Sequence, residues 1–174
     1  EYTVTLTASN NLGFQQASAV ITVTEALAVD PGGSETTRDG VLTFSIPTTV
    51  TGTVTFAYTP QAALASTPGG FEFAGLAFDL RAADAAGNPI IEPDEPFTLT
   101  IHYDESALPA GTDETTLELY RYDADSEIWL ALIVLARDPE NDTLTVRLDH
   151  FSKFVLLVEA ADTSYQINLP LVIR

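Results

Sequence analysis

Short apolar segments separated by proline and glycine turns occupy most of this chain, and their spacing limits the fold more than any other feature. The turns include Pro47, Pro60, Pro68-Gly69-Gly70 and Gly87-Asn88-Pro89. The segments between such turns are 41–46, 53–58, 71–80, 96–103, 115–122, 128–135, 143–148 and 153–159. Short strands joined by turns are typical of two packed antiparallel sheets. We therefore predict an all-β fold, an antiparallel β-sandwich over residues 40–160.

The N-terminal residues show the same alternation outside that domain. Tyr2, Val4 and Leu6 alternate with threonines, and after a turn at 9–13 the pattern resumes through Ile21 and Val23. This pattern predicts a β-hairpin within residues 1–26.

Two other segments complete the domain organisation. Residues 27–39 are polar and contain Pro31-Gly32-Gly33, so we predict a linker there. In the tail, residues 161–174, alternation through Ile167, Leu169 and Leu171 predicts a strand. Pro170 lacks an amide hydrogen, so this tail strand should either lie at the edge of a sheet or bind through the half that has no proline.

A lone hairpin is at best marginally stable in water, so both terminal segments need another sheet to join. We predict that they form an assembly interface between copies of the chain. The residues assigned to this interface are Tyr2, Val4, Leu6, Ile21, Val23, Ile167, Leu169 and Leu171.

The charge balance excludes several classes of partner. Among 174 residues, 7 are Lys or Arg and 25 are Asp or Glu, which gives a formal net charge of −18. So few cations argue against binding to nucleic acid or to anionic membranes. The longest apolar run, 128–136, is too short to span a bilayer. The chain has no Cys, which excludes disulfides and thiolate metal sites, and it has no Met and starts at Glu1, so we expect an extracellular piece of a longer protein.

The sequence His150-Phe151-Ser152 is the sharpest candidate for chemistry. Self-cleavage between Phe151 and Ser152 would need the serine hydroxyl to attack the Phe151 carbonyl, His150 to move the proton, and a strained peptide. The interpretation that we favour is that Phe151 and Phe154 anchor the core while His150 and Ser152 form hydrogen bonds at the start of a strand. No nucleotide-binding, hydrolase or zinc motif is present, so we expect no enzyme acting on other molecules.

Two weaker patterns concern ligands. Asp123, Asp125 and Glu127 have the alternate spacing that calcium loops use, although Ile128 stands where a calcium hand has Gly. We favour a solvated hairpin turn and expect no cofactor, with calcium as the open alternative. Tyr120 and Tyr122 share one face of their strand.

Together with Tyr103, Phe71 and Trp129, these two tyrosines would give a stacking platform for a cell-surface glycan. For Trp129 itself we favour packing in the core.

The run from Tyr2-Thr-Val4-Thr-Leu6 to Asn10-Asn-Leu-Gly13, followed by Ala19-Val-Ile21-Thr-Val23, resembles the last two strands of a polycystic-kidney-disease (PKD) repeat. PKD repeats are small immunoglobulin-like sandwiches of extracellular proteins, where they act as spacers or adhesive modules. The resemblance covers residues 2–24 and lacks the earlier strands of the repeat.

The following domain is similar in running order to the β-sandwich of netrin receptors, ankyrins and many secreted bacterial proteins. The resemblance rests on Phe78-Asp-Leu80, Leu117-Glu-Leu119-Tyr-Arg-Tyr122, Trp129 and the His150-Phe151-Ser152 triplet, at which some members cut their own backbone. It implies an immunoglobulin-like sandwich exported by a bacterium.

These observations lead to one principal expectation. The chain would be a structural subunit or terminal module of a bacterial cell-surface fibre or adhesin, a homo-polymer built by strand donation. The alternatives are a self-processing domain that cleaves between Phe151 and Ser152, and a carbohydrate-binding module.

Overall fold

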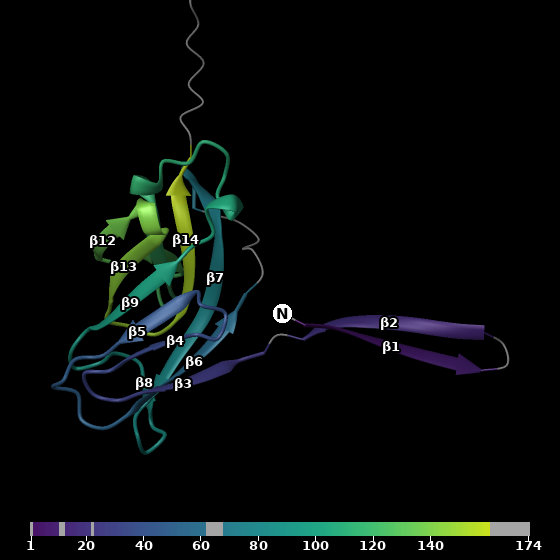
Figure 1. The fold of residues 1–174 in the computed structure, drawn as a ribbon, viewed down its shortest axis with the longest axis horizontal. Coiled ribbons are helices and arrows are strands. Elements are labelled where there is room, and N and C mark those ends of the chain that lie inside the picture. Colours follow the sequence, from purple (N-terminus) through teal and green to yellow (C-terminus); the bar gives the residue numbers. More distant parts are fainter. Residues whose placement is uncertain (1, 11–12, 22, 62–67, 161–174) are drawn as a thin grey trace, which may run out of the picture.

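The computed structural model describes residues 23–61 and 68–160 in full, together with the backbone of residues 2–10 and 13–21. The described residues form an all-β structure with no α-helix (Figure 1). Three single turns of 3-10 helix interrupt the strands: η1 (Glu105–Ala107), η2 (Glu114–Thr116) and η3 (Pro139–Asn141). The predicted all-β class is confirmed. No helix in this part of the chain has both the length and the apolar character needed to cross a membrane.

Two antiparallel sheets make the sandwich, and the order of strands in each fixes which strands are edges. The larger sheet has the order β11 (Ile128–Ala131), β10 (Glu118–Asp123), β14 (Lys153–Glu159), β7 (Phe71–Ala83), β6 (Val54–Pro60) and β3 (Glu25–Val29), with β8 (Pro89–Ile90) also pairing with β7. The smaller sheet has the order β12 (Val134–Asp138), β13 (Thr143–Leu148), β9 (Phe97–His102), β5 (Leu42–Ser45) and β4 (Ser34–Thr36). The predicted antiparallel β-sandwich is therefore confirmed.

The core lies between the two sheets because alternate residues of each strand point inward. In β5, β6, β9 and β13 every second side chain is buried, as the period-2 alternation requires. Phe44 of the smaller sheet stacks on Phe56 of the larger one with ring centroids 4.4 Å apart. A second stacked pair, Phe78 and Phe154, joins β7 to β14 at 5.2 Å. These aromatic pairs place the centre of the core between β5, β6 and β7.

A smaller cluster covers the outer face of the larger sheet. Its buried members are Ala77, Tyr120, Val155 and Leu157, and Phe71, Phe73 and Trp129 pack against them. The strand β14 is therefore buried on both faces, which explains why its apolar residues run consecutively instead of alternating.

The prediction of a linker over residues 27–39 is wrong. Residues Glu25–Val29 pair with β6, and Ser34–Thr36 pair with β5, so both segments belong to the sandwich. Pro31-Gly32-Gly33 is the turn at which the chain crosses from one sheet to the other. Gly32 adopts a φ of 74°, and the Gly33 amide donates to the Asp30 carbonyl at 2.8 Å. Turn residues that resembled a linker thus connect two edge strands, and the sandwich begins at Glu25 rather than near Gly40.

The prediction of a single strand over 128–135 is also wrong. The chain forms β11 in one sheet and β12 in the other, and it crosses between them at Leu132, whose side chain is buried in the core. No Gly or Pro marks this crossing, because a buried leucine makes the corner.

The N-terminal hairpin is present at the level of the backbone. Strands β1 (Tyr2–Asn10) and β2 (Gly13–Ile21) pair antiparallel, with Tyr2 opposite Ile21 and Val4 opposite Ala19. Strand β2 ends before Val23, which the sequence pattern had placed inside it. Among the described strands, β1 and β2 pair only with each other.

Candidate functional site

The two sides of the sandwich end differently, and these edges are the features of the fold most suited to assembly. On one side β3 lies beside β4, and on the other side β11 continues into β12. We call the first the closed edge (residues 25–37) and the second the open edge (Ile128, Leu130, Ile133 and Leu135).

The closed edge buries its apolar side chains. Leu27 and Val29 point inward and are 7% and 0% exposed. The exposed residues of its two strands, β3 and β4, are small or polar, and they are Ala26, Ala28, Ser34, Glu35 and Thr36. Small and polar side chains give an edge strand little apolar surface with which to attract another chain.

Hydrogen bonds close the end of this edge. The buried Thr37 hydroxyl accepts from the Leu42 amide at 2.9 Å and donates to Asp39 at 2.6 Å. Asp39 also accepts from the Tyr58 hydroxyl at 3.3 Å. Burial raises the pKa of Tyr58 above its ordinary value, and the neighbouring Asp39 carboxylate raises it further.

The open edge exposes aliphatic side chains. Ile128, Ile133 and Leu135 are 49%, 56% and 55% exposed, and they are three of the five large apolar residues exposed in the described part of the chain. Leu130, which lies opposite Arg121 of β10, is half-buried. The pairing of β12 with β13 shifts register between Val134 and Ala136, so Leu135 lies at a bulge.

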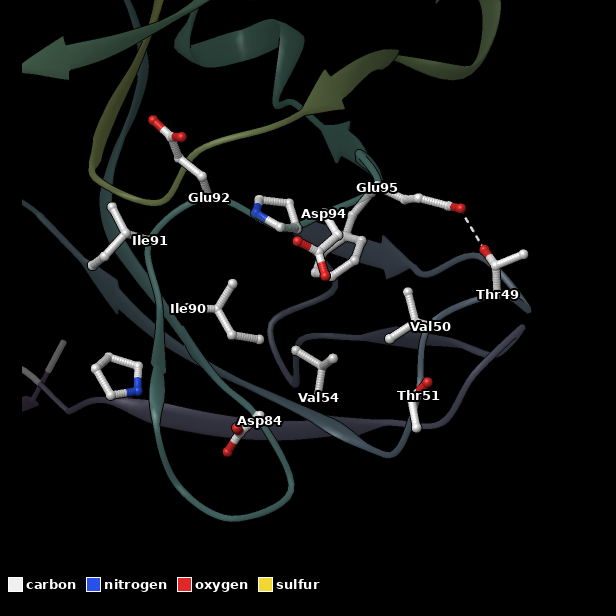
Figure 2. Close-up of a pocket in the computed structure, with 13 residues that line it drawn as sticks. Thr49, Val50, Thr51, Val54, Asp84, Ile90, Ile91, Glu92, Asp94 and Glu95 are labelled. Atoms are coloured by element: carbon white, nitrogen blue, oxygen red, sulfur yellow. Dashed lines mark hydrogen bonds between the residues drawn. The ribbon is translucent and has the colours of Figure 1, made fainter.

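A separate hollow of about 660 Å³ lies at one end of the sandwich, between the β5–β6 loop and the segment 84–97 (Figure 2). Its floor is apolar and includes Val50, Val54 and Ile90, whereas its rim carries Asp84, Glu92, Asp94 and Glu95. Figure 2 shows Asp84, Glu92 and Glu95 on three different sides of this hollow rather than converging on one point.

Two of the four rim carboxylates, Asp84 and Glu95, have hydrogen-bond partners within the protein. Asp84 accepts hydrogen bonds from the side-chain and main-chain nitrogens of Asn88, both at 2.8 Å, and these bonds lower the pKa of Asp84. Thr49 donates a short hydrogen bond to Glu95. Throughout the described residues, no three His, Cys, Asp or Glu side chains come together in a way that could hold a metal ion.

The structure places the His150-Phe151-Ser152 triplet at the entry to β14. Phe151 is buried between Phe56 and Phe97, with ring centroids at 5.9 and 6.0 Å, and Phe154 is buried as well. The prediction that both phenylalanines anchor the core is confirmed. His150 differs from the prediction, because its Nδ1 is buried with no hydrogen-bond partner in the described structure.

The hydrogen bonds of the triplet hold it in place rather than activating a nucleophile. The Ser152 hydroxyl donates to the Tyr122 carbonyl at 2.6 Å, and the Ser152 carbonyl accepts from the Leu80 amide. The Phe151 amide donates to the Ile91 carbonyl at 3.0 Å. The residues with left-handed backbone outside glycine are Glu127 and Asp142, so this form of strain is not found at the triplet. This geometry favours the structural interpretation over self-cleavage.

Asp123, Asp125 and Glu127 lie in and beside the turn between β10 and β11. The Asp123 carboxylate accepts from the amides of Asp125 at 3.0 Å and Ser126 at 3.4 Å, and these hydrogen bonds lower its pKa. Glu127 has a φ of 56° and both it and Asp125 are exposed. The segment thus forms the exposed hairpin turn that we favoured, and Asp123 caps its backbone.

The fold brings four of the five aromatic residues predicted as a sugar platform, Phe71, Tyr120, Tyr122 and Trp129, together on the outer face of the larger sheet, and it buries the fifth, Tyr103, in the core between the sheets. Tyr103 is buried and donates from its hydroxyl to Glu114 at 2.6 Å. Tyr120 is 9% exposed and packs against Phe71. Tyr122 and Trp129 lie side by side with centroids 5.2 Å apart, but their planes are tilted by 57°.

Trp129 is half-buried against the outer cluster, so the prediction that it packs in the core is wrong. The reason is that β11 places every second residue on the outer face, and Trp129 is at one of those positions opposite Tyr122.

The predicted assembly residues fall into three groups. Tyr2, Val4, Leu6 and Ile21 lie within β1 and β2. Val23 follows the hairpin and is 48% exposed. Ile167, Leu169 and Leu171 lie outside the described residues.

Sequence reasoning missed Ile133 and Leu135, because a continuous apolar run is typical of a buried strand. Residues 132–135 are all aliphatic, so the sequence carries no signal that separates the buried Leu132 from the exposed Ile133 and Leu135.

No family model matches the chain, and a search of curated proteins finds no relative. The function must therefore be argued from the residues and geometry described above.

Proposed function

We propose that this protein is a structural subunit or terminal module of an extracellular bacterial fibre or adhesin, and that it assembles by β-strand donation between copies. The observation that carries the proposal is the hairpin β1–β2, which pairs with no other described strand. A two-stranded hairpin needs further strands or a packed face for stability. A second copy of the protein supplies such a surface.

The charge of the hairpin supports donation to another copy. Residues 2–24 contain no charged side chain, although the whole chain has a formal net charge of −18. Two copies repel each other in general, but an uncharged strand adds nothing to that repulsion and loses no ionic hydration when it is buried.

The proposal is consistent with the resemblances of the sequence. The hairpin is similar to the end of a PKD repeat, and the sandwich is similar to immunoglobulin-like modules of secreted proteins. Both types act as spacers or adhesive units, so the protein would work by binding and load-bearing, without turnover of a substrate and without a cofactor.

A substitution in the hairpin tests this function. Val4→Asp and Ile21→Asp place a charge at neighbouring positions of the pairing register, and we expect each to abolish polymers, because burying an unpaired carboxylate costs several kcal/mol, on the order of 3 or more. Sedimentation and electron microscopy would measure assembly, and thermal unfolding would show that the sandwich is intact.

Thr5→Asp is the matched control, since it adds the same charge at a position that alternates with Val4. We expect it to leave polymers in place. Polymers that persist in both Val4→Asp and Ile21→Asp would contradict the proposed function.

A further inference from the structure

We infer that the open edge, formed by Ile128, Leu130, Ile133 and Leu135, is the acceptor surface, and that its occupant is the β1–β2 hairpin of a second copy. This inference rests on the proposed function and goes beyond it, because strand donation alone does not say which edge receives the strand.

The sandwich offers two edges, and only one has apolar surface to bury. At the closed edge the inward side chains Leu27 and Val29 are already covered. At the open edge Ile128, Ile133 and Leu135 are each about half exposed, at 49%, 56% and 55%. Covering such side chains removes apolar surface from water, which is favourable in proportion to the area, so the open edge gains more from an added strand.

The backbone of this edge is also available. β11 pairs only with β10, and β12 pairs only with β13, among the strands that the structure describes. The outer side of each strand therefore presents amide and carbonyl groups to which an added strand can hydrogen-bond.

Charge matches the hairpin to this edge. Residues 128–136 contain no charged side chain, and neither do residues 2–24. The closed edge carries Glu25, Asp30 and Glu35, which would remain near any strand added there. The pairing of two uncharged segments is thus the contact between copies that avoids the repulsion of strongly acidic surfaces.

The positions of donor and acceptor predict an open polymer. The hairpin is joined through residues 22–24 to β3, which is one end of the larger sheet, whereas β11 is the other end of that sheet. Five strand spacings of about 4.8 Å separate these ends, roughly 24 Å. A contact between different surfaces at opposite sides of a subunit is heterologous and builds a filament when the rotation does not close.

Cross-linking between two variants of the 174-residue chain tests the contact directly. The chain contains no cysteine, so only the introduced cysteines can react. One copy carries Thr5→Cys and the other carries Leu135→Cys, and a short bis-maleimide joins cysteines that lie close together. We expect at least tenfold more cross-linked dimer than for Thr5→Cys mixed with Ala28→Cys, the matched position on the closed edge. A copy with Gln166→Cys in place of Thr5→Cys tests the tail as the occupant.

Lysine substitutions test the same surface through assembly. Ile133→Lys combined with Leu135→Lys should abolish polymers, whereas Ala26→Lys combined with Ala28→Lys should retain them. All four residues are exposed, so both double variants should keep the thermal midpoint of the wild type.

The outcomes separate this inference from the proposed function. Polymers that survive the open-edge lysines, yet dissolve in Val4→Asp, would overturn the acceptor surface and leave strand donation standing. Cross-linking from Gln166→Cys that exceeds that from Thr5→Cys would overturn the hairpin as the occupant. A wild-type chain that stays monomeric at every concentration would overturn both.

Discussion

The two edges of the sandwich use their apolar residues in opposite ways. At the closed edge Leu27 and Val29 fill the core, and small or polar residues face solvent. At the open edge Leu132 fills the core, while Ile133 and Leu135 on either side of Val134 remain exposed. The closed edge contributes to folding, and the open edge keeps apolar surface that folding does not use.

This difference separates the apolar residues that stabilise the sandwich from the apolar residues that stay exposed. Polar and small residues limit unwanted pairing on one side, as natural edge strands commonly require. Exposed aliphatic residues on the other side carry a free-energy cost in water that an added strand would remove. Equivalent substitutions at each edge can test whether the residues that stabilise the fold are separate from those that expose apolar surface.

The largest expected difference comes from truncating one leucine or isoleucine at each edge. Leu27→Ala should lower the free energy of unfolding by about 2–4 kcal/mol, because it removes buried methyl groups and leaves a cavity. Ile133→Ala should change it by less than about 0.5 kcal/mol, because Ile133 is 56% exposed. Urea unfolding followed by tryptophan fluorescence at Trp129 measures both values. Equal losses of stability would show that the open edge is packed in solution.

A smaller loss of stability is expected when the Thr37 hydroxyl at the closed edge is removed. Thr37→Val removes the acceptor of the Leu42 amide and leaves that buried group unpaired, which should cost about 1–3 kcal/mol. Thr36→Val is the control, because Thr36 is exposed and its hydroxyl bonds only to the exposed Thr43 hydroxyl at 2.9 Å among the described residues. Thermal unfolding of the two variants would rank them. A larger loss in Thr36→Val would contradict the role assigned to Thr37.

The smallest change in stability at neutral pH is expected from a substitution of Tyr58. The effect of this residue on stability grows at alkaline pH. Its pKa in the folded state lies above the ordinary value of 10.0, owing first to burial and then to Asp39. Below about pH 10 the phenol is protonated in both states, so its contribution to stability is complete. As the pH rises further the unfolded chain loses the proton first, and stability must fall.

Tyr58→Phe should therefore reduce the alkaline loss of stability, although burial also raises the pKa of Tyr103 and Tyr120, so part of the loss will remain. The measurement is the thermal midpoint between pH 8 and 11 at roughly one-unit steps. An unchanged slope in the variant would contradict the contribution of Tyr58.

Most of the sandwich could be predicted from the sequence because period-2 alternation directly reports one buried face. This held for β5, β6, β9 and β13, where every second residue is buried. It failed over residues 27–39, where a short strand with only Leu27 and Val29 buried lies next to Pro31-Gly32-Gly33. An alternation with only two buried residues is a weaker signal for a strand than Pro31-Gly32-Gly33 is for a turn, so the segment was predicted as a linker.

The open edge was harder to predict, because a strand lies at an edge only when no further strand pairs with it. The run 128–136 shows no sign in its composition that Leu132 is a corner and that Ile133 is exposed. The burial of Phe151 and the hairpin turn after Asp123 followed from local chemistry and were predicted, whereas the hydrogen bond from the Asp125 amide to Asp123 was not. Which strand ends a sheet depends on long-range pairing, and this information is spread over the whole chain.

The place of β14 has a consequence for the order in which the protein can be made. This strand is the last of the described sandwich, yet it pairs with both β10 and β7 in the middle of the larger sheet, and Figure 1 shows it beside β7. Until it leaves the ribosome, β7 and β10 lack the neighbour that joins them, and Phe78 lacks the ring of Phe154. Pairings between such distant segments form slowly. The larger sheet can therefore close only after β14 has been synthesised, and until then the earlier strands of the sandwich lack their central partner.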